Sequence, residues 1–207
     1  MAIVAVLDYG IGNLHSAQKA LEKVGADARL TADPALIRDA AGVVLPGVGN
    51  FGRCIEALER TGLDELAIEA AGSGRPFLGV CIGMQMLYEA SEESPDAPGL
   101  GILPGVVRRL PDGVKRPQMQ WNLLVRRGPS GLLDGVPDPV WTYFVHSFAA
   151  DRDDHAVAVC DYGGPVVAAV EREALWATQF HPEKSGATGL AILANFVARA
   201  SRAAEAA

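Results

Sequence analysis

The sequence has few cysteines, no long apolar run and no excess of basic residues. Its 207 residues include three cysteines, Cys54, Cys81 and Cys160, which are far apart and form no C-x-x-C pair. This spacing argues against a disulfide framework and a structural zinc site, and it indicates a reducing compartment. Cys54 and Cys160 lie in apolar segments, where core packing is the simpler role. We expect neither a metal nor a cofactor.

The other absences argue against two further classes of protein. No stretch approaches the roughly 20 apolar residues that a membrane-spanning helix needs. The apolar residues 1–7 follow no basic segment and end at Asp8, so we expect a buried first strand rather than a signal peptide, and a cytoplasmic protein. A net charge of −7, dispersed along the chain, argues against nucleic-acid binding, which needs a basic face.

Short apolar runs alternate with helical patterns in the first half of the chain. Apolar residues at helical spacing from Leu14 to Val24 predict a helix that ends at Gly25, and the same spacing recurs between residues 55 and 68. Strands that alternate with helices predict a parallel sheet covered on both faces. The strands expected here are residues 2–7, 29–30, 42–45 and 77–80.

The second half changes to short apolar runs separated by turn residues, which predicts an antiparallel layer that continues the same domain. Apolar residues from Leu190 to Val197 predict a final helix, and residues 91–104, rich in Pro and Gly, predict a long surface loop. We expect one domain over residues 1–200 and a frayed tail over residues 201–207. The strands expected here are residues 106–107, 123–125, 140–145, 156–160, 166–170 and 175–179.

The most informative segment is Gly79-Val80-Cys81-Ile82-Gly83, which precedes a helix-like stretch that reaches Tyr88. It has the G-x-nucleophile-x-G pattern of a nucleophile elbow, with cysteine as the nucleophile. Such a turn exposes the sulfur at the end of a strand and at a helix N-terminus, where unpaired N–H groups favour the reactive thiolate. By itself, the pattern fits a buried cysteine in a strand-to-helix corner equally well.

A cysteine nucleophile needs a base, and the base needs a group that orients it. His181 follows the last predicted strand, and Glu183 is placed to accept an N–H from its imidazole, which would fix the tautomer and stabilise the imidazolium. An isolated His-Pro-Glu is more often a surface turn. Among the other histidines, His15 and His155 look like ordinary helix and loop residues, and His146 looks like a packed strand residue.

An acyl-transfer site also needs two donors for the oxyanion. In an elbow, one donor is the backbone N–H of the residue after the nucleophile, here Ile82. The loop Gly47-Val48-Gly49 follows a predicted strand and is well placed to supply the other, because its glycines allow close approach to a ligand. They also leave the peptide between them free to rotate before a ligand or partner binds. Without the elbow, a plain glycine turn is the simpler interpretation.

Together, these motifs resemble the class I (triad) glutamine amidotransferases, in family order from Asp8 to Phe196. The resemblance is closer to the glutaminase subunits of imidazole glycerol phosphate synthase, which act in histidine biosynthesis. It implies a flavodoxin-like three-layer α/β fold with a central, mostly parallel sheet and an additional antiparallel layer. The segments that carry the closer resemblance are residues 8–13 (DYGIGN), 99–105 (GLGILPG), 121–122 (WN), 143–147 (YFVHS) and 181–185 (HPEKS).

The resemblance implies an enzyme that hydrolyses L-glutamine to glutamate and ammonia. Cys81 would attack the side-chain amide and form a thioester, with His181 as acid and then base, and with Glu183 orienting His181. It also implies that Glu93 meets the substrate's amino group and that Gln85 contacts the substrate. The implied oxyanion and substrate residues are Gly47, Val48, Gly49, Ile82, Gln85, Glu93, His146, Ser147 and Phe148.

The resemblance further implies a heterodimer with a (βα)₈-barrel cyclase subunit that receives the ammonia. A closed passage is needed because ammonia released to water would be protonated. In one place the chain departs from the family's usual Pro-His-Met-Gly-Trp-Asn: Gln118 and Gln120 replace the histidine and the glycine. This change affects the expected interface but not the triad. The positions that match the interface are Asn13, Trp121, Tyr143 and Lys184.

Two other functions remain open from the sequence. A triad glutaminase that serves another synthase, such as the pyridoxal phosphate one, would share the elbow, but residues 8–13 and 143–147 argue against it. A non-catalytic binding or stress protein on the same scaffold would explain an exposed cysteine. It would not explain why His181, Glu183 and Gln85 occur together.

Overall fold

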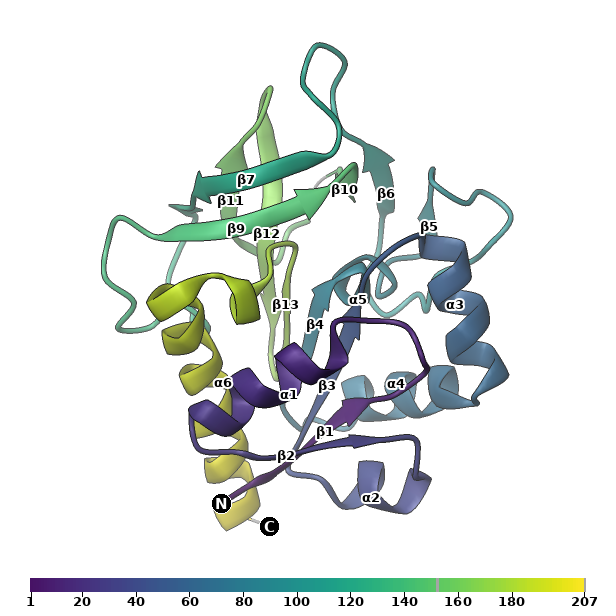
Figure 1. Ribbon diagram of the computed structural model, residues 1–207, viewed down its shortest axis with the longest axis vertical. Coiled ribbons are helices and arrows are strands. Elements are labelled where there is room, and N and C mark those ends of the chain that lie inside the picture. Colours follow the sequence, from purple (N-terminus) through teal and green to yellow (C-terminus); the bar gives the residue numbers. More distant parts are fainter. Residues whose placement is uncertain (152, 207) are drawn as a thin grey trace.

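The computed structural model describes residues 1–151 and 153–206, which build an eight-stranded mixed sheet flanked by helices (Figure 1). The strand order is β2-β1-β3-β4-β13-β12-β11-β8. Its first five strands are parallel, as the alternation of strands and helices in the sequence predicts. They are β2 (Asp27–Thr31), β1 (Ile3–Leu7), β3 (Gly42–Gly47), β4 (Phe77–Cys81) and β13 (Leu175–Thr178).

Most strands of the second half are antiparallel, but they do not form one layer, and the strand expected over residues 175–179 is instead β13, which pairs parallel with β4. Three of these antiparallel strands extend the central sheet, namely β12 (Pro165–Arg172), β11 (Ala156–Asp161) and β8 (Val125–Arg126). The others form two smaller sheets. These are β10-β6-β5 (Phe148–Ala150, Val106–Arg109, Ala90–Ser91) and the ribbon of β7 (Gln118–Leu123) and β9 (Trp141–His146).

Helices pack on the sheet as the right-handed crossovers of parallel strands require. Two of them, α1 (Leu14–Lys23) and α6 (Gly186–Ala206), contact each other. Asp33 and Asn50 begin α2 and α3 by accepting backbone N–H groups of the first turn. The remaining helical segments are α2 (Pro34–Asp39), α3 (Phe51–Arg60), α4 (Leu63–Gly72), α5 (Ile82–Gln85) and the 3₁₀ turn η1 (Pro182–Lys184).

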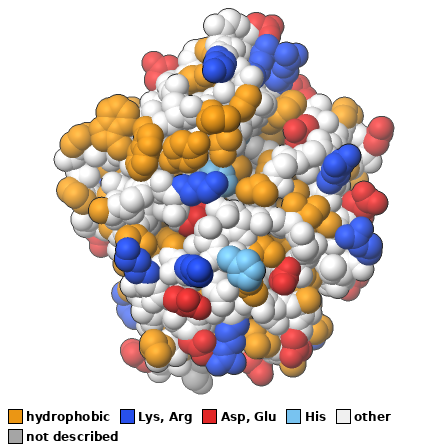
Figure 2. Space-filling view, in the orientation of Figure 1, with side chains coloured by type: hydrophobic (Ala, Val, Ile, Leu, Met, Phe, Trp, Pro, Cys, Tyr) orange, Lys and Arg blue, Asp and Glu red, His pale blue; other side chains and the backbone are white. Residues whose placement is uncertain are grey.

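The core lies on both sides of the central strands. Every residue of β3 and β4 is buried, which matches their continuous apolar sequence. The β7–β9 ribbon differs, because it leaves large apolar side chains in solvent; Figure 2 shows hydrophobic side chains gathered over this ribbon. The exposed apolar residues of the ribbon are Met119, Trp121, Leu123 and Trp141.

Residues 201–206 of the tail that is expected to fray form the last turns of α6, in keeping with the high helix propensity of their alanines; Ala207 lies outside the described residues. Two sequence expectations need correction. The helix after the elbow ends at Gln85 rather than at Tyr88. The strand predicted over residues 123–125 is interrupted at Leu124, which lies between the end of β7 at Leu123 and the start of β8 at Val125.

No helix within residues 1–151 and 153–206 is long and apolar enough to cross a membrane.

Candidate active site

Cys81 ends β4 at the point where the chain turns into α5. Its φ of 55° lies in the left-handed region, which a residue with a side chain rarely adopts and which costs about 1–3 kcal/mol. A Cβ on Gly83 would overlap the carbonyl oxygen of Leu45 in β3, so this position of α5 needs a glycine. The strained backbone and the close packing on β3 are the features expected of a nucleophile elbow.

The Cys81 sulfur faces a pocket of about 470 Å³ rather than open solvent. The residue is 3% exposed, so the expectation of an exposed sulfur is wrong: walls from β9 and from the loop after β3 enclose it. A pocket of this size accommodates a small metabolite. The lining residues are Gly12, Asn13, Val48, Gly49, Cys81, Ile82, Gln85, Glu93, Pro117, Val145, His146, Ser147, Phe148, His181 and Lys184.

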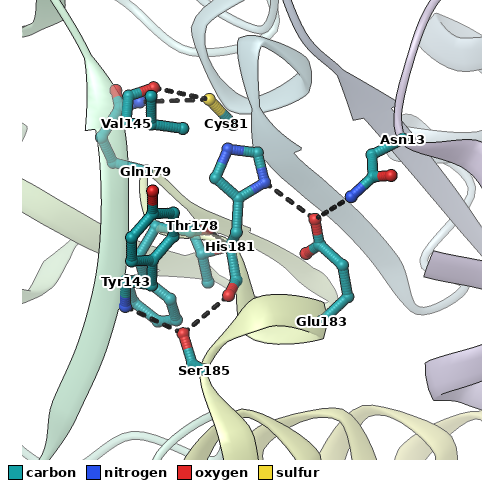
Figure 3. Close-up of polar contacts among 10 residues, drawn as sticks. Asn13, Cys81, Tyr143, Val145, Thr178, Gln179, His181, Glu183 and Ser185 are labelled. Atoms are coloured by element: carbon teal, nitrogen blue, oxygen red, sulfur yellow. Dashed lines mark hydrogen bonds and ion pairs between the residues drawn. The ribbon is translucent and has the colours of Figure 1, made fainter. Parts of the chain in front are cut away.

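The imidazole of His181 lies between the Cys81 sulfur and the Glu183 carboxylate (Figure 3). Its Nδ1 is 2.8 Å from Glu183 Oε1, and both side chains are buried. Because a carboxylate only accepts, Nδ1 carries the proton of this bond, and Nε2 is the nitrogen that faces the sulfur. Asn13 Nδ2 donates to the same Glu183 oxygen over 3.2 Å. Asn13 therefore helps to hold the carboxylate, although sequence reasoning assigned it only to the partner face.

Main-chain bonds fix the position of His181 beside β9. Its backbone N–H donates to the carbonyl of Tyr143 over 2.9 Å. The hydroxyl of Ser185 donates to the carbonyl of His181 over 2.6 Å and accepts the N–H of Tyr143 over 3.0 Å (Figure 3). These bonds fix the backbone of His181 on both sides of its α-carbon, and the bond from Nδ1 to Glu183 orients the ring.

The two buried histidines differ in charge at neutral pH. Burial lowers the pKa of His181, but hydrogen bonding and charge from Cys81 and Glu183 outweigh burial and raise this pKa to about 10. His181 is therefore an imidazolium at neutral pH. Burial lowers the pKa of His146 to about 4, and its Nδ1 bonds the carbonyl of Phe148 over 2.8 Å. His146 is neutral, which agrees with its interpretation as a packed residue.

Two buried side chains hold the glycine loop that the sequence predicts as an oxyanion donor. The hydroxyl of Tyr9 donates to the carbonyl of Pro46 over 2.6 Å, and the thiol of Cys54 donates to the carbonyl of Val48 over 3.4 Å. Gly47 pairs with Cys81 in register, so the loop begins directly beside the nucleophile. Only the peptide between Gly47 and Val48 lies between these two anchors. This peptide lies in the segment that the flanking glycines are expected to leave free to rotate.

The residues expected to contact substrate come together around the pocket. Gln85 donates through Nε2 to the carbonyl of Phe148 over 2.8 Å, and this bond joins α5 to β10. Glu93 accepts the backbone N–H of Phe51 through Oε2 over 2.7 Å, at the start of α3. Of the expected oxyanion and substrate residues, all line the pocket except Gly47, which lies in a smaller cavity behind His181.

The four expected interface positions divide into two pairs. Asn13 and Lys184 line the pocket, whereas Trp121 and Tyr143 lie on the β7–β9 ribbon with their rings in edge contact, 6.1 Å between centroids. The two departures from the family pattern also differ. Gln118 is fully buried and its amide nitrogen is 4.0 Å from the sulfur of Cys160, and Gln120 is exposed.

Sequence reasoning missed Gln179 and Val145, which both contact the nucleophile. The amide nitrogen of Gln179 is 3.8 Å from Cys81 Sγ, and the carbonyl of Val145 is 4.0 Å from it (Figure 3). A glutamine two residues before His181 in the sequence lies on the same side of an extended chain as that histidine. That spacing was the available signal. Among the described residues, no group of His, Cys, Asp and Glu side chains could hold a metal ion.

Comparisons with known proteins agree with this geometry. Residues 5–200 match the family model for glutamine amidotransferase class-I. Imidazole glycerol phosphate synthase subunit HisH of Desulfitobacterium hafniense is 46% identical over 196 residues, which cover 94% of this chain and 93% of the relative. HisH of Methanothermobacter thermautotrophicus is 48% identical, covering 94% of this chain and 98% of the relative.

The solved structure of PurLQS from Thermotoga maritima superposes with a TM-score of 0.75 at 20% identity, covering 96% of this chain and 99% of that one. At this identity, the likeness supports the fold alone. The family match and the HisH relatives go further, because they cover nearly the whole chain at high identity. The chain therefore belongs to the class-I glutamine amidotransferases, within the family of imidazole glycerol phosphate synthase HisH subunits.

Proposed function

We propose that the protein hydrolyses L-glutamine to glutamate and ammonia as the glutaminase subunit of an imidazole glycerol phosphate synthase. The observation that carries the proposal is the position of the His181 ring, between the Cys81 sulfur and the Glu183 carboxylate at the wall of the pocket. A nucleophile, a proton carrier and an orienting anion are the three groups that acyl transfer from an amide requires.

The first half of the reaction uses His181 as an acid. The Cys81 thiolate attacks the side-chain carbonyl carbon of glutamine, and the negative charge moves to the carbonyl oxygen. Backbone N–H groups of Ile82 and of the Gly47–Gly49 loop are the proposed donors to this oxyanion. When the C–N bond breaks, the His181 imidazolium gives its Nε2 proton to the leaving nitrogen. The products of this half are ammonia and a glutamyl thioester.

The second half uses the same ring as a base. His181 is neutral once it has given its proton to the leaving nitrogen, and it stays neutral because acylation removes the thiolate charge, which is one of the causes of its raised pKa. Neutral His181 takes a proton from water, and the resulting hydroxide attacks the thioester. Collapse of the intermediate expels the Cys81 thiolate and releases glutamate. The thiolate and the imidazolium are thereby restored.

The pocket suits the polar end of an amino acid. Glu93 supplies a negative charge for the α-ammonium group, and its second oxygen is free of the bond to Phe51 that fixes the first. Both N–H groups of the Gln85 amide have acceptors, which leaves Oε1 as a buried acceptor without a partner among the described residues. Residues 146–148 line the same pocket, and we propose that their backbone holds the α-carboxylate.

The exposed apolar side of the β7–β9 ribbon supports the proposal that the protein binds a partner subunit. Met119, Trp121 and Leu123 alternate along β7, opposite Val145, Tyr143 and Trp141 of β9. Such a strip is unusual in solvent and is typical of a protein interface. It runs to the pocket, since Val145 touches the sulfur. We propose that a (βα)₈-barrel cyclase subunit covers this strip, with Asn13 and Lys184 at the pocket edge, and receives the ammonia.

Glutamate release measured with and without the cyclase subunit tests the proposal. We expect low activity of the isolated chain and a large increase when the cyclase subunit and its ligand are added. Cys81→Ala should abolish both activities while the circular dichroism spectrum stays unchanged. Retention of full activity by this variant would overturn the mechanism. Equal rates with and without the cyclase subunit would overturn the partnership.

A further inference from the structure

The side chain of Gln179 contacts the reactive sulfur from a position outside the triad. Gln179 directly follows β13, which runs parallel to β4 with Thr178 opposite Val80, so the next residues of both strands, Gln179 and Cys81, are neighbours. The amide Nε2 of Gln179 is 3.8 Å from Cys81 Sγ, and the residue is fully buried. A buried glutamine amide needs hydrogen-bond partners, and here the sulfur is one of them.

Neighbouring groups settle which end of this amide faces the sulfur. The carbonyl of Phe148 only accepts, so the Gln85 atom at 2.8 Å from it is the amide nitrogen. That nitrogen also lies 3.0 Å from the Gln179 side chain, and a second donor there would be repelled. The facing Gln179 atom is therefore Oε1. Its nitrogen must then point at Cys81, and a chain of hydrogen bonds runs from Phe148 through Gln85 and Gln179 to the sulfur.

We propose that Gln179 is a catalytic residue, which donates an N–H hydrogen bond to the Cys81 thiolate. A donor in a dry site stabilises a charged acceptor far more than a neutral one. The bond therefore favours the thiolate that attacks glutamine, weakens when the sulfur is acylated, and strengthens again when the thiolate leaves. His181 supplies charge on one side of the sulfur, and Gln179 supplies a fixed dipole on another. The inference rests on the proposed glutaminase reaction.

Alkylation of Cys81 by iodoacetamide, followed over a range of pH with peptide mapping, tests the inference without glutamine. Cys54 and Cys160 are fully buried and are not expected to compete. Gln179→Met removes the donor and keeps a side chain of similar length. We expect the pH midpoint of alkylation to move upward by about one unit, and kcat/KM for glutamine to fall about tenfold or more.

A second variant and a control separate chemistry from folding. Gln179→Glu keeps the acceptor for Gln85 but places an oxygen against the sulfur, so the midpoint should move further upward. Gln18→Met is the matched control, because Gln18 also donates one side-chain bond, over 3.0 Å to the carbonyl of Ala28, but on the outer helix α1. It should leave the midpoint and kcat/KM unchanged.

A Gln179→Met protein with a lower melting temperature but the wild-type alkylation midpoint would overturn the inference, because Gln179 would then serve only the fold. The same holds if Gln179→Glu alkylates like wild type. These two outcomes can be distinguished from a failure of the proposed function. If wild type releases no glutamate even with its cyclase partner, while the midpoint still depends on Gln179, the sulfur contact stands and the glutaminase proposal fails.

Discussion

Replacement of Glu183 by glutamine isolates the charge of the orienting group. The amide can still accept the Nδ1–H of His181 at the present 2.8 Å, so the tautomer is retained and only the negative charge is lost. The two charges are delocalised beyond the bonded atoms, which are 2.8 Å apart, so we take an effective separation of about 4 Å. At an effective dielectric constant of about 20, this separation corresponds to an attraction of about 4 kcal/mol.

An attraction of that size, at about 1.4 kcal/mol per factor of ten, limits the loss to about 10³-fold. We expect kcat/KM of Glu183→Gln to fall by a factor of about 10² to 10³, since solvent and relaxation recover part of the energy. The pKa of His181 should fall as well, because the Glu183 anion is one of the causes that raise it. The alkaline limb of the pH profile should therefore move to lower pH by about two units.

A stopped assay of glutamate release between pH 6 and pH 11, on the complex with the cyclase subunit, measures both effects; this range spans about one unit beyond the His181 pKa of about 10. Glu59→Gln, which neutralises an exposed carboxylate on α3, is the control and should match wild type. Wild-type activity of Glu183→Gln would refute the role of the charge. A rate loss with an unmoved alkaline limb would refute the electrostatic explanation and leave only a packing role.

Three further outcomes are expected. Gly83→Ala should lower stability by about 1–3 kcal/mol in urea unfolding, because its Cβ would overlap a backbone carbonyl, whereas Gly72→Ala, with no atom within 4 Å of the new Cβ, should not. The pKa of His146 is lowered to about 4, so between about pH 6.5 and pH 4 this histidine is protonated in the unfolded chain but neutral in the native protein. The free energy of unfolding should therefore decrease as the pH falls through this range, and His146→Gln should make this decrease smaller. Trp121→Ala should weaken binding to the cyclase subunit about tenfold or more by titration calorimetry, with basal glutaminase unchanged. Wild-type stability of Gly83→Ala would contradict the first prediction, and an unchanged pH dependence of stability in His146→Gln would contradict the second. Wild-type affinity of Trp121→Ala for the cyclase subunit would contradict the third.

The parts of the fold that sequence predicts are those set by local pattern. Continuous apolar runs identify β3 and β4, and the glycines around Cys81 identify the elbow, because each depends on residues close together in the chain. The site is harder to predict because its contacts are non-local. Asn13 reaches Glu183 across 170 positions, and Gln179 reaches Cys81 across 98. No spacing rule connects such pairs, since they meet only when parallel strands set their ends side by side.

The exposed ribbon shows a second limit of sequence patterns. The apolar run over residues 140–145 predicts a strand of an antiparallel layer but not its exposure, and Trp121 and Trp141 are about half exposed, at 48% and 47%. A pattern of alternating side chains indicates which residues share a face, but it does not say whether the same chain or a partner covers that face.

Acid quenching during turnover with glutamine, followed by digestion and mass spectrometry, shows which residue carries the acyl group. We expect a glutamyl group on the peptide that contains Cys81, absent in Cys81→Ala and accumulating when hydrolysis is slowed. A turning-over enzyme whose glutamyl group resides on another residue, or a Cys81→Ala protein that still releases glutamate at the wild-type rate, would contradict this expectation.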